Sequence, residues 1–383
     1  MGNGLSSRYE LTEVYNASNF ADKFNFVNLP DRNDGYVYYQ RKEEAMSQGL
    51  YAIRDNEVYI GVDHSTDLTQ SGLPGRASLR LESKSRYKYG LIVARFTHLP
   101  ALRCGTWPAF WTVGDSWPAG GEIDLFEGFN EDGLNRPAFH VGGSDRLGAC
   151  RLDGAGQSSQ VSTANCDNKF QDPPLQWPGQ GCTSADPRGL RAYSNGGTYA
   201  LEWAGSHIKL YNFERGREPA DLASPTPDTA TWGTPSVFLK APHCDIDSHF
   251  QAQRLVLDIA FCGNPTGTAL WDSCWERTNH STCADYVAGS PADFAETYFQ
   301  IQDIRVFTMQ RILHPERVSG GGGGRDAAWP PTRKRPGETE HRDVLNATLG
   351  FRPAGYSPMK NGSMRFGVSA FALFLVFALM LGA

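Results

Sequence analysis

The chain has 383 residues and a formal net charge of −6, with 42 acidic residues against 36 Lys and Arg. This length exceeds that of a typical single domain, and the acidic balance argues against a nucleic-acid partner. Aromatic residues make up 12% of the chain, which also holds 41 Gly and 23 Pro, so the composition predicts many short strands joined by turns.

Segments that alternate between apolar and polar residues recur along the chain and predict β-strands. Five clear examples are residues 91–97, 198–203, 207–211, 255–261 and 299–307. The sequence shows no long amphipathic helical pattern. It therefore predicts an all-β fold of the β-sandwich type.

Three carboxylates stand out in the segment 121–128, which reads Gly-Glu-Ile-Asp-Leu-Phe-Glu-Gly. Ionised side chains repel one another and resist desolvation, so a strand that only had to pack would seldom carry them so close together. Regular alternation places Glu122 and Asp124 on one face and Glu127 on the other. A single bulged residue at Leu125 or Phe126 would bring Glu127 onto the face of the other two.

Paired carboxyl groups are what hydrolysis of a glycosidic bond requires. At a separation of about 5–5.5 Å, one group attacks the anomeric carbon while the other protonates the leaving oxygen. Glu122 and Glu127 could satisfy this spacing if the bulge brings them together. An acidic, solvated strand or a divalent-cation site would also account for the cluster, and the carboxylates alone leave these alternatives open.

Trp107 and Trp111 precede Glu122 by 15 and 11 residues. Indole rings stack on the apolar faces of sugars, so these two side chains are candidates for substrate binding. Core packing is the commoner role of a single Trp. Trp107 and Trp111 are nevertheless better candidates than the tryptophans farther along the chain, which do not flank the acids.

Eight cysteines are predicted to form disulfides in an oxidising compartment, because their number is even and their spacing is wide. No Cys-x-x-Cys pair occurs, which argues against a zinc site. Spacing does not fix the pairing, since eight cysteines allow about 105 connectivities. They are Cys104, Cys150, Cys166, Cys182, Cys244, Cys262, Cys274 and Cys283.

The stretch 105–111, Gly-Thr-Trp-Pro-Ala-Phe-Trp, together with 121–128 resembles fungal glycoside hydrolase family 16, the laminarinase-type endo-β-1,3(4)-glucanases. The resemblance extends through residues 61–63, 75–78, 200–203 and 261–263. It implies a concanavalin-like jelly roll with a concave substrate cleft, and β-glucan as the substrate. We expect a monomer that needs no cofactor or catalytic metal. Whether it binds a structural calcium ion is left open by the sequence.

The resemblance also assigns roles to single residues. Glu122 matches the nucleophile of the family, Glu127 the general acid/base, and Asp124 the carboxylate that tunes and orients this pair. A negative neighbour raises the pKa of a carboxylic acid, which helps the acid/base to stay protonated. His140 matches a histidine on the leaving-group side of the cleft, with a purely structural histidine as the alternative.

One segment departs from the family pattern. Asn264, Pro265 and Thr266 follow the Phe-Cys-Gly turn, where relatives often carry an acidic residue and a Trp. If that Trp stacks on a donor-side sugar, this chain has a reshaped subsite. The preference between β-1,3 and mixed-linkage glucan is therefore open.

The composition divides the chain into four parts. Residues 1–8 are unassigned and lack an apolar segment, so we infer that a signal peptide is missing from this chain. Residues 9–318 form the predicted catalytic domain. Residues 319–365 begin with Ser and five Gly and continue as a polar, Pro-bearing stretch, which predicts a disordered linker.

Residues 366–383 carry no charge and are predominantly apolar, which is typical of a glycosylphosphatidylinositol attachment signal. Asn361 is the expected attachment residue, and a retained hydrophobic tail anchor is the alternative. The chain is therefore expected to be extracellular, at the cell surface or in the cell wall, and bound to the membrane through a lipid anchor.

Three functions remain open at this point. The first is a retaining endo-β-1,3(4)-glucanase that acts through a covalent glycosyl-enzyme. The second is a cell-wall glucan transglycosylase, in which a sugar hydroxyl replaces water. The third is a non-catalytic β-glucan-binding protein, against which the intact Glu122 and Glu127 count. The long spacing between the acids favours hydrolysis, since the fungal-wall transglycosylases of the family carry a shorter one.

Overall fold

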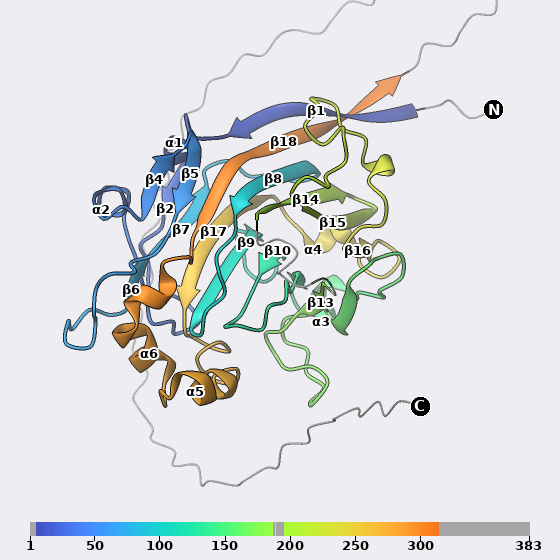
Figure 1. Ribbon diagram of the computed structural model, residues 1–383. Helices are drawn as coiled ribbons and strands as arrows, with labels where there is room; N and C mark the ends of the chain where they lie inside the picture. Colours follow the sequence, from blue (N-terminus) through green and yellow to red (C-terminus); the bar gives the residue numbers. More distant parts are fainter. Residues whose placement is uncertain (1–4, 187, 189–194, 314–383) are drawn as a thin grey trace, which may run out of the picture. The chain divides into compact units, whose positions relative to one another are not determined.

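The computed structural model describes residues 5–186, 188 and 195–313. These residues form two large antiparallel sheets (Figure 1). Sheet A contains, in spatial order, β16 (Val237–Lys240), β15 (His207–Glu214), β14 (Gly197–Ala204), β8 (Gly90–His98), β18 (Phe299–Leu313), β5 (Glu57–Ile60) and β4 (Tyr51–Arg54), and β1 (Leu5–Tyr15) pairs with β18.

Sheet B carries the segment with the three carboxylates near its middle. Its strand order is β12 (Gln160–Thr163), β13 (Cys182–Ala185), β11 (Ala138–His140), β10 (Glu122–Glu127), β9 (Thr106–Gly114), β17 (Gln253–Phe261), β7 (Arg80–Ser83) and β2 (Phe24–Phe26). A separate parallel pair joins β3 (Val37–Tyr39) to β6 (Arg76–Ser78). The predicted strands and the predicted β-sandwich are confirmed.

Aromatic side chains from both sheets meet in the core between them. Phe96 and Tyr199 of sheet A lie edge-on to Phe110 and Phe126 of sheet B, with ring centroids 5.6 Å apart in both pairs. All four side chains are buried. Burial of each such ring contributes roughly 1.5–3 kcal/mol, so this layer fixes which face of each strand points inward.

A second, smaller apolar cluster covers the other face of sheet A. Within it, Glu202 accepts hydrogen bonds from the hydroxyls of Tyr9 (3.2 Å), Tyr211 (3.2 Å) and Thr229 (2.9 Å) and pairs with Lys209 at 3.1 Å. A buried carboxylate with this many donors keeps its charge. The cluster consists of Tyr9, Leu91, Val93, Ala200, Tyr211, Leu222, Trp232 and Phe307.

Helical segments of the described chain are short, with at most seven residues each. Four disulfides join all eight cysteines, so the predicted disulfides are confirmed: Cys104–Cys274, Cys150–Cys244, Cys166–Cys182 and Cys262–Cys283. The helices are α1 (Phe20–Lys23), α2 (Lys42–Ser47), α3 (Ser144–Leu147), α4 (Ile246–His249), α5 (Asp272–Thr278) and α6 (Cys283–Gly289), with 3₁₀ turns η2 (Thr229–Thr231) and η3 (Pro291–Phe294).

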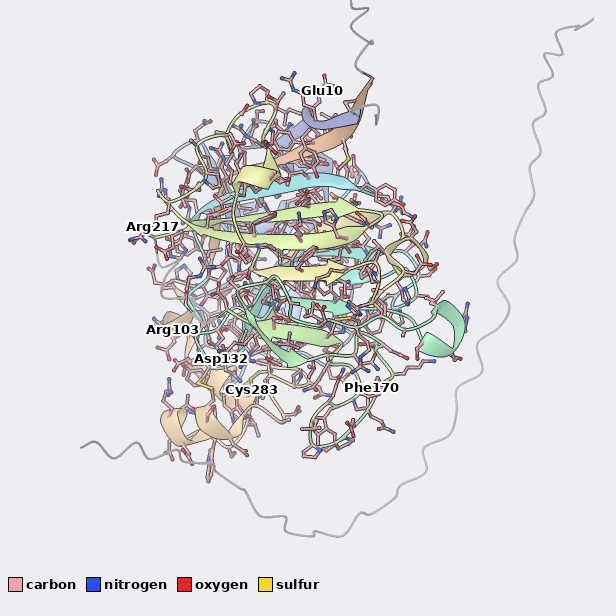
Figure 2. All side chains as sticks on the ribbon, turned by 90° about the vertical axis from the view of Figure 1, so that its right-hand side faces the viewer. Glu10, Arg103, Asp132, Phe170, Arg217 and Cys283 are labelled. Atoms are coloured by element: carbon pink, nitrogen blue, oxygen red, sulfur yellow. A yellow bond between two sulfur atoms is a disulfide. The ribbon has the colours of Figure 1, made fainter. Side chains whose placement is uncertain are left out.

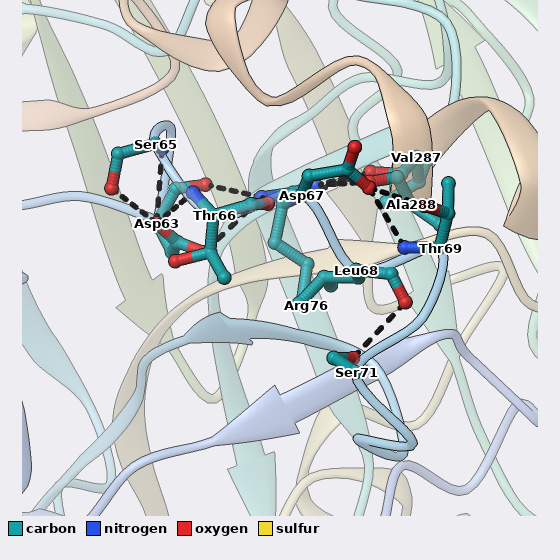
Figure 3. Close-up of polar contacts among 10 residues, drawn as sticks. All are labelled: Asp63, Ser65, Thr66, Asp67, Leu68, Thr69, Ser71, Arg76, Val287 and Ala288. Carbon is teal, nitrogen blue, oxygen red and sulfur yellow. Dashed lines mark hydrogen bonds and ion pairs between the residues drawn. The ribbon is translucent and has the colours of Figure 1, made fainter.

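Arg76 anchors the loop after β5 to helix α6. Its guanidinium is fully buried, pairs with Asp63 at 3.2 Å and donates to the carbonyl oxygens of Val287 and Ala288 (Figure 3). A buried guanidinium is stable only when its donors are satisfied, so this contact set fixes the loop and the helix together.

The described residues contain no helix that is long and apolar enough to cross a membrane. Strand β1 begins at Leu5, four residues before the expected start of the catalytic domain. The predicted linker 319–365, the tail 366–383 and the attachment residue Asn361 lie outside the described residues.

Candidate active site

A bulge in β10 decides where the three carboxylates point. Against β9, Asp124 pairs with Trp111 and Phe126 pairs with Phe110, so that Leu125 is the extra residue. Phe126 consequently turns inward to the aromatic core, and the next residue, Glu127, points outward. The predicted bulge is therefore present at Leu125 and places Glu127 on the face of Glu122 and Asp124.

The outer face of sheet B that carries these acids is called the carboxylate face below. The strand pairing arranges its side chains in rows that run across the strands. One row contains Arg254, Val113, Glu122 and His140. A second row contains Glu82, Val256, Trp111, Asp124 and Ala138, and a third contains Arg80, Asp258, Ala109 and Glu127.

Burial is the main perturbation of the acids. The side chains of Glu122 and Asp124 keep 14% and 5% of their exposure. Burial, with smaller effects of neighbouring charges, raises the pKa of Glu122 to about 8, that of Glu127 to about 7, and that of Asp124 well above its usual range. The cluster therefore retains protons at neutral pH, where an isolated carboxyl group is ionised.

Opposing contacts favour ionised forms. A hydrogen bond from Trp117 and the positive charge of Arg80 lower the pKa of Glu122 against the effect of burial. Trp107 donates its indole N–H to Oε1 of Glu127 at 2.9 Å. Burial in the site thus favours protonated carboxyl groups, while the donors stabilise ionised ones. A centre that both gives and takes protons requires both effects.

His140 stands opposite Glu122 on the neighbouring strand. Its Nε2 lies 3.5 Å from Oδ2 of Asp124 and 3.8 Å from Oε1 of Glu122, and its Nδ1 lies 2.9 Å from Oδ1 of Asn168. An amide oxygen only accepts, so Nδ1 carries the proton. Burial lowers the pKa of His140, which makes the ring neutral and leaves Nε2 as an acceptor toward Asp124.

Trp111 has a different neighbour from Trp107. Its indole N–H donates to Oδ1 of Asp258 at 2.9 Å, and the guanidinium of Arg80 lies over its ring, 4.8 Å from the centroid. Both candidate tryptophans therefore lie on the carboxylate face and are partly exposed. Their use as stacking platforms for sugars remains a prediction.

Sequence reasoning missed several residues of the site. Asp258, on β17, joins the acids as a fourth buried carboxyl group, and burial raises its pKa to about 6. A lone acid in the apolar run 255–261 was the available signal. Asn135 and Trp117 were also missed, although Trp117 lies in the Trp-Pro pair just before the acids and remains 45% exposed.

The ligand atoms of Glu122, Asp124 and His140 all lie within 4.8 Å of one another, which is close enough to hold a cation. Trp117 and Arg80 stabilise the carboxylate of Glu122, and Asn168 bonds to the imidazole of His140, so these groups have partners without a bound cation. Within the described residues, the other group with such spacing includes Cys150 and Cys244, which are joined in a disulfide.

The segment that departs from the family pattern follows directly after β17. The backbone N–H of Asn264 donates to the carbonyl oxygen of Asn33 at 2.8 Å, and Thr266 is fully buried. Thr266 therefore offers no side chain to a substrate. The reshaped donor-side subsite remains a prediction.

A β-sandwich with clustered, buried carboxyl groups beside indole rings on one sheet face belongs to the class of carbohydrate-active, glycosidase-type proteins. A family model described as the XgeA-like, catalytic GH16 domain matches residues 24–307. The chain belongs to glycoside hydrolase family 16. The resemblance drawn from the sequence motifs is thereby confirmed.

Fungal relatives extend beyond the matched region. A probable endo-1,3(4)-β-glucanase of Aspergillus flavus is 37% identical over 313 residues, which are 80% of this chain and 45% of that protein. An endo-1,3(4)-β-glucanase of Arthroderma benhamiae is 36% identical over 312 residues, 79% of this chain and 65% of that protein. The chain thus spans only 45% to 65% of the length of these relatives.

Two solved structures share the fold along their full length. An elongating family 16 β-1,3-glucosyltransferase has a TM-score of 0.70 and 32% identity, and the match covers 78% of this chain and 100% of that one. Laminarinase 16A of Phanerochaete chrysosporium, with 6-O-glucosyl-laminaritriose in donor and acceptor sites, has a TM-score of 0.71, 31% identity and coverage of 79% and 100%. The predicted jelly-roll sandwich is confirmed.

Proposed function

We propose that this chain is a retaining endo-β-1,3(4)-glucanase. The observation that carries the proposal is the bulge at Leu125, which places Glu127 on the carboxylate face together with Glu122. Two carboxyl groups on one face suit a double-displacement reaction, in which Trp117 and Arg80 favour the ionised form of Glu122 and burial favours the protonated form of Glu127. The relatives named as endo-1,3(4)-β-glucanases support a β-glucan substrate.

In the first step, an oxygen of ionised Glu122 attacks the anomeric carbon while Glu127 gives its proton to the departing glycosidic oxygen. The bond between that carbon and oxygen breaks, and a glycosyl ester with Glu122 forms. In the second step, Glu127 takes a proton from water, the water oxygen attacks the anomeric carbon, and Glu122 leaves as a carboxylate. Both carboxyl groups end in their starting protonation states.

Asp124 supports this cycle from beside Glu122. Its raised pKa keeps it protonated, and Oδ2 has no hydrogen-bond partner within the described part of the chain. A neutral acid at this position adds no negative charge next to the nucleophile, and its proton can move toward His140 Nε2, 3.5 Å away. Asp124 and His140 therefore position and buffer the two reacting groups.

A glucan transglycosylase is the second candidate. In that reaction a sugar hydroxyl takes the place of water in the second step, and Glu127 takes the proton from this hydroxyl as it would from water. The similarity to an elongating β-1,3-glucosyltransferase favours this alternative. The long spacing between Glu122 and Glu127 favours hydrolysis, and a non-catalytic binding protein would have no use for three buried acids.

We also propose that the enzyme acts outside the cell, at the cell surface or in the wall, as a monomer held by a lipid anchor at Asn361. Four disulfides within the described residues support an oxidising compartment. Phosphatidylinositol-specific phospholipase C should release active enzyme from cells that carry the anchored form. Recovery of the peptide around Phe371 from the mature protein would overturn the lipid anchor.

Product analysis on laminarin, lichenan and a defined oligosaccharide acceptor tests the function. A hydrolase yields shorter oligosaccharides, and a transglycosylase also yields products longer than the substrate. Proton NMR of the first product should show the β-anomer, because two displacements restore the configuration. An α-anomer, or no turnover of either glucan, would overturn the proposal.

A further inference from the structure

The loop between Cys166 and Cys182 is held in one conformation by a disulfide and by internal hydrogen bonds. Its two ends are joined by a disulfide with a sequence separation of 16. Inside it, the buried amide of Gln176 donates to the carbonyl oxygens of Asn165 (2.6 Å) and Gly181 (2.8 Å). The loop therefore holds its shape without any ligand.

This loop touches the active site directly at His140. Asn168 Oδ1 accepts from His140 Nδ1 at 2.9 Å. Gly181 lies so close to the same ring that a Cβ on it would meet Nδ1 at 2.8 Å, and its φ is +59°. Both ends of the loop thus fix the imidazole, and any shift of the loop would be transmitted to His140.

The outer part of the loop exposes apolar side chains. Trp177 is 53% exposed and Leu175 is 74% exposed. The backbone of Trp177 is held by Gln180, whose Oε1 accepts from its N–H at 2.7 Å, and Gly179 donates to the carbonyl oxygen of Asn168 at 2.9 Å. These two hydrogen bonds fix the backbone on which the exposed indole of Trp177 stands. The second of them, at Gly179, links this backbone to Asn168, the partner of His140.

The position of the loop relative to the acids follows from the strand order. The loop joins β13, next to β11, on the opposite side of β10 from β17 and β7. Phe170, in the first third of the loop, lies below the stacked strands in Figure 2, as does Cys283 of α6. A glucan that crosses the strands over Glu122 and Glu127 passes His140 and then reaches this loop.

We propose that Trp177 is a stacking platform for the acceptor-side part of the β-glucan chain, beyond the sugar that His140 faces. An exposed, backbone-fixed indole binds the apolar face of a pyranose with little loss of entropy. This inference rests on the proposed function, because the acceptor side exists only if Glu122 and Glu127 cleave a glucan. In the second step, where water and a sugar hydroxyl compete for the glycosyl-enzyme, Trp177 would strengthen the binding of the acceptor sugar.

The test uses the full chain and compares Trp177→Ala with Leu175→Ala, which removes a more exposed apolar side chain from the same loop. Laminaribiosyl β-fluoride serves as the donor and laminaritriose as the acceptor. For Trp177→Ala, the acceptor concentration that gives half-maximal transfer should rise by about tenfold, the scale for removing an aromatic anchor. Fluoride release without acceptor should change much less, since fluoride needs no acceptor-side sugar.

Leu175→Ala should leave both readouts as in the wild type, and Trp177→Phe should restore most of the acceptor affinity. Equal acceptor dependence in Trp177→Ala and the wild type would overturn the inference while the hydrolase survives. A parallel loss of fluoride release would also overturn it, because the loop would then act only through His140. If the wild type releases no fluoride at all, the proposed function itself fails.

Discussion

The side chain of Asn135 spans the bulge and holds Glu127 in place. Its Oδ1 accepts from the backbone N–H of Glu127 at 3.0 Å, and its Nδ2 donates to the carbonyl oxygen of Leu125 at 3.1 Å. Asn135 is fully buried. A bulge leaves backbone groups without strand partners, and this one amide satisfies one on each side of Phe126.

Asn135→Ala should therefore lower both stability and activity. Two buried backbone groups lose their partner, which costs about 1–3 kcal/mol of unfolding free energy. Displacement of Glu127 should lower kcat by about 10- to 100-fold. Urea unfolding and laminarin hydrolysis measure the two effects. Glu202→Gln, on the opposite sheet, controls for lost stability alone, and equal kcat values in the two variants would contradict this role of Asn135.

Glu122→Gln should reduce laminarin turnover by about a thousandfold or more, because the amide keeps the shape of the side chain and cannot act as the nucleophile. The melting temperature and laminarin binding should stay close to those of the wild type, since the amide fills the same space and can accept the hydrogen bond from Trp117. Steady-state kinetics and a binding isotherm check both points. More than about a tenth of wild-type activity would contradict the assignment.

Glu127→Ala should discriminate between substrates. An aryl β-laminarioside needs little protonation of its leaving group, so the first step survives and the glycosyl-enzyme accumulates, while laminarin hydrolysis is lost. Azide should restore turnover of the aryl substrate and yield a β-glycosyl azide, since it attacks the glycosyl-enzyme from the face that water uses. Equal loss on both substrates would require another role for Glu127.

Asp124→Asn should leave the alkaline limb of the pH profile in place. Burial and the neighbouring acids hold the pKa of Asp124 well above its usual range, so the protonated side chain and the amide are both neutral and neither adds a charge beside Glu127. In the wild type and in the variant this limb should lie near the pKa of about 7 for Glu127, above which the acid/base has lost its proton. Measurements of kcat/KM against pH test this, and a shift of the limb to lower pH in the variant would show that Asp124 is ionised in the wild type.

Glu202→Gln should lower stability at neutral pH and weaken its acid dependence. Against the effect of burial, contacts with His207 and Lys209 lower the pKa of Glu202 to about 2. A folded-state pKa below the unfolded one of about 4.3 adds stability on the order of 3 kcal/mol at pH 7, which disappears as the pH falls from about 4.5 toward 2. Urea unfolding at pH 7 and pH 3 should show a smaller difference in the variant. An unchanged difference would mean that Glu202 titrates normally.

The local sequence determined the strands and the positions of the three acids. Glu122, Asp124 and Glu127 break the alternation of a strand at one step, and a bulge is the only local change that unites them on one face. The even cysteine count likewise predicted disulfides. These features depend on neighbouring residues along the chain, which a sequence displays directly.

Tertiary structure alone decided which distant residues complete the site. Asp258 and Arg80 reach the acids because β17 lies beside β9 and β7 lies beside β17, and Asn135 reaches the bulge because the chain folds back after β10. The pairing of Cys104 with Cys274, 170 residues apart, has the same origin. Strand order is set by the burial of whole sheet faces against each other, so no local pattern encodes it.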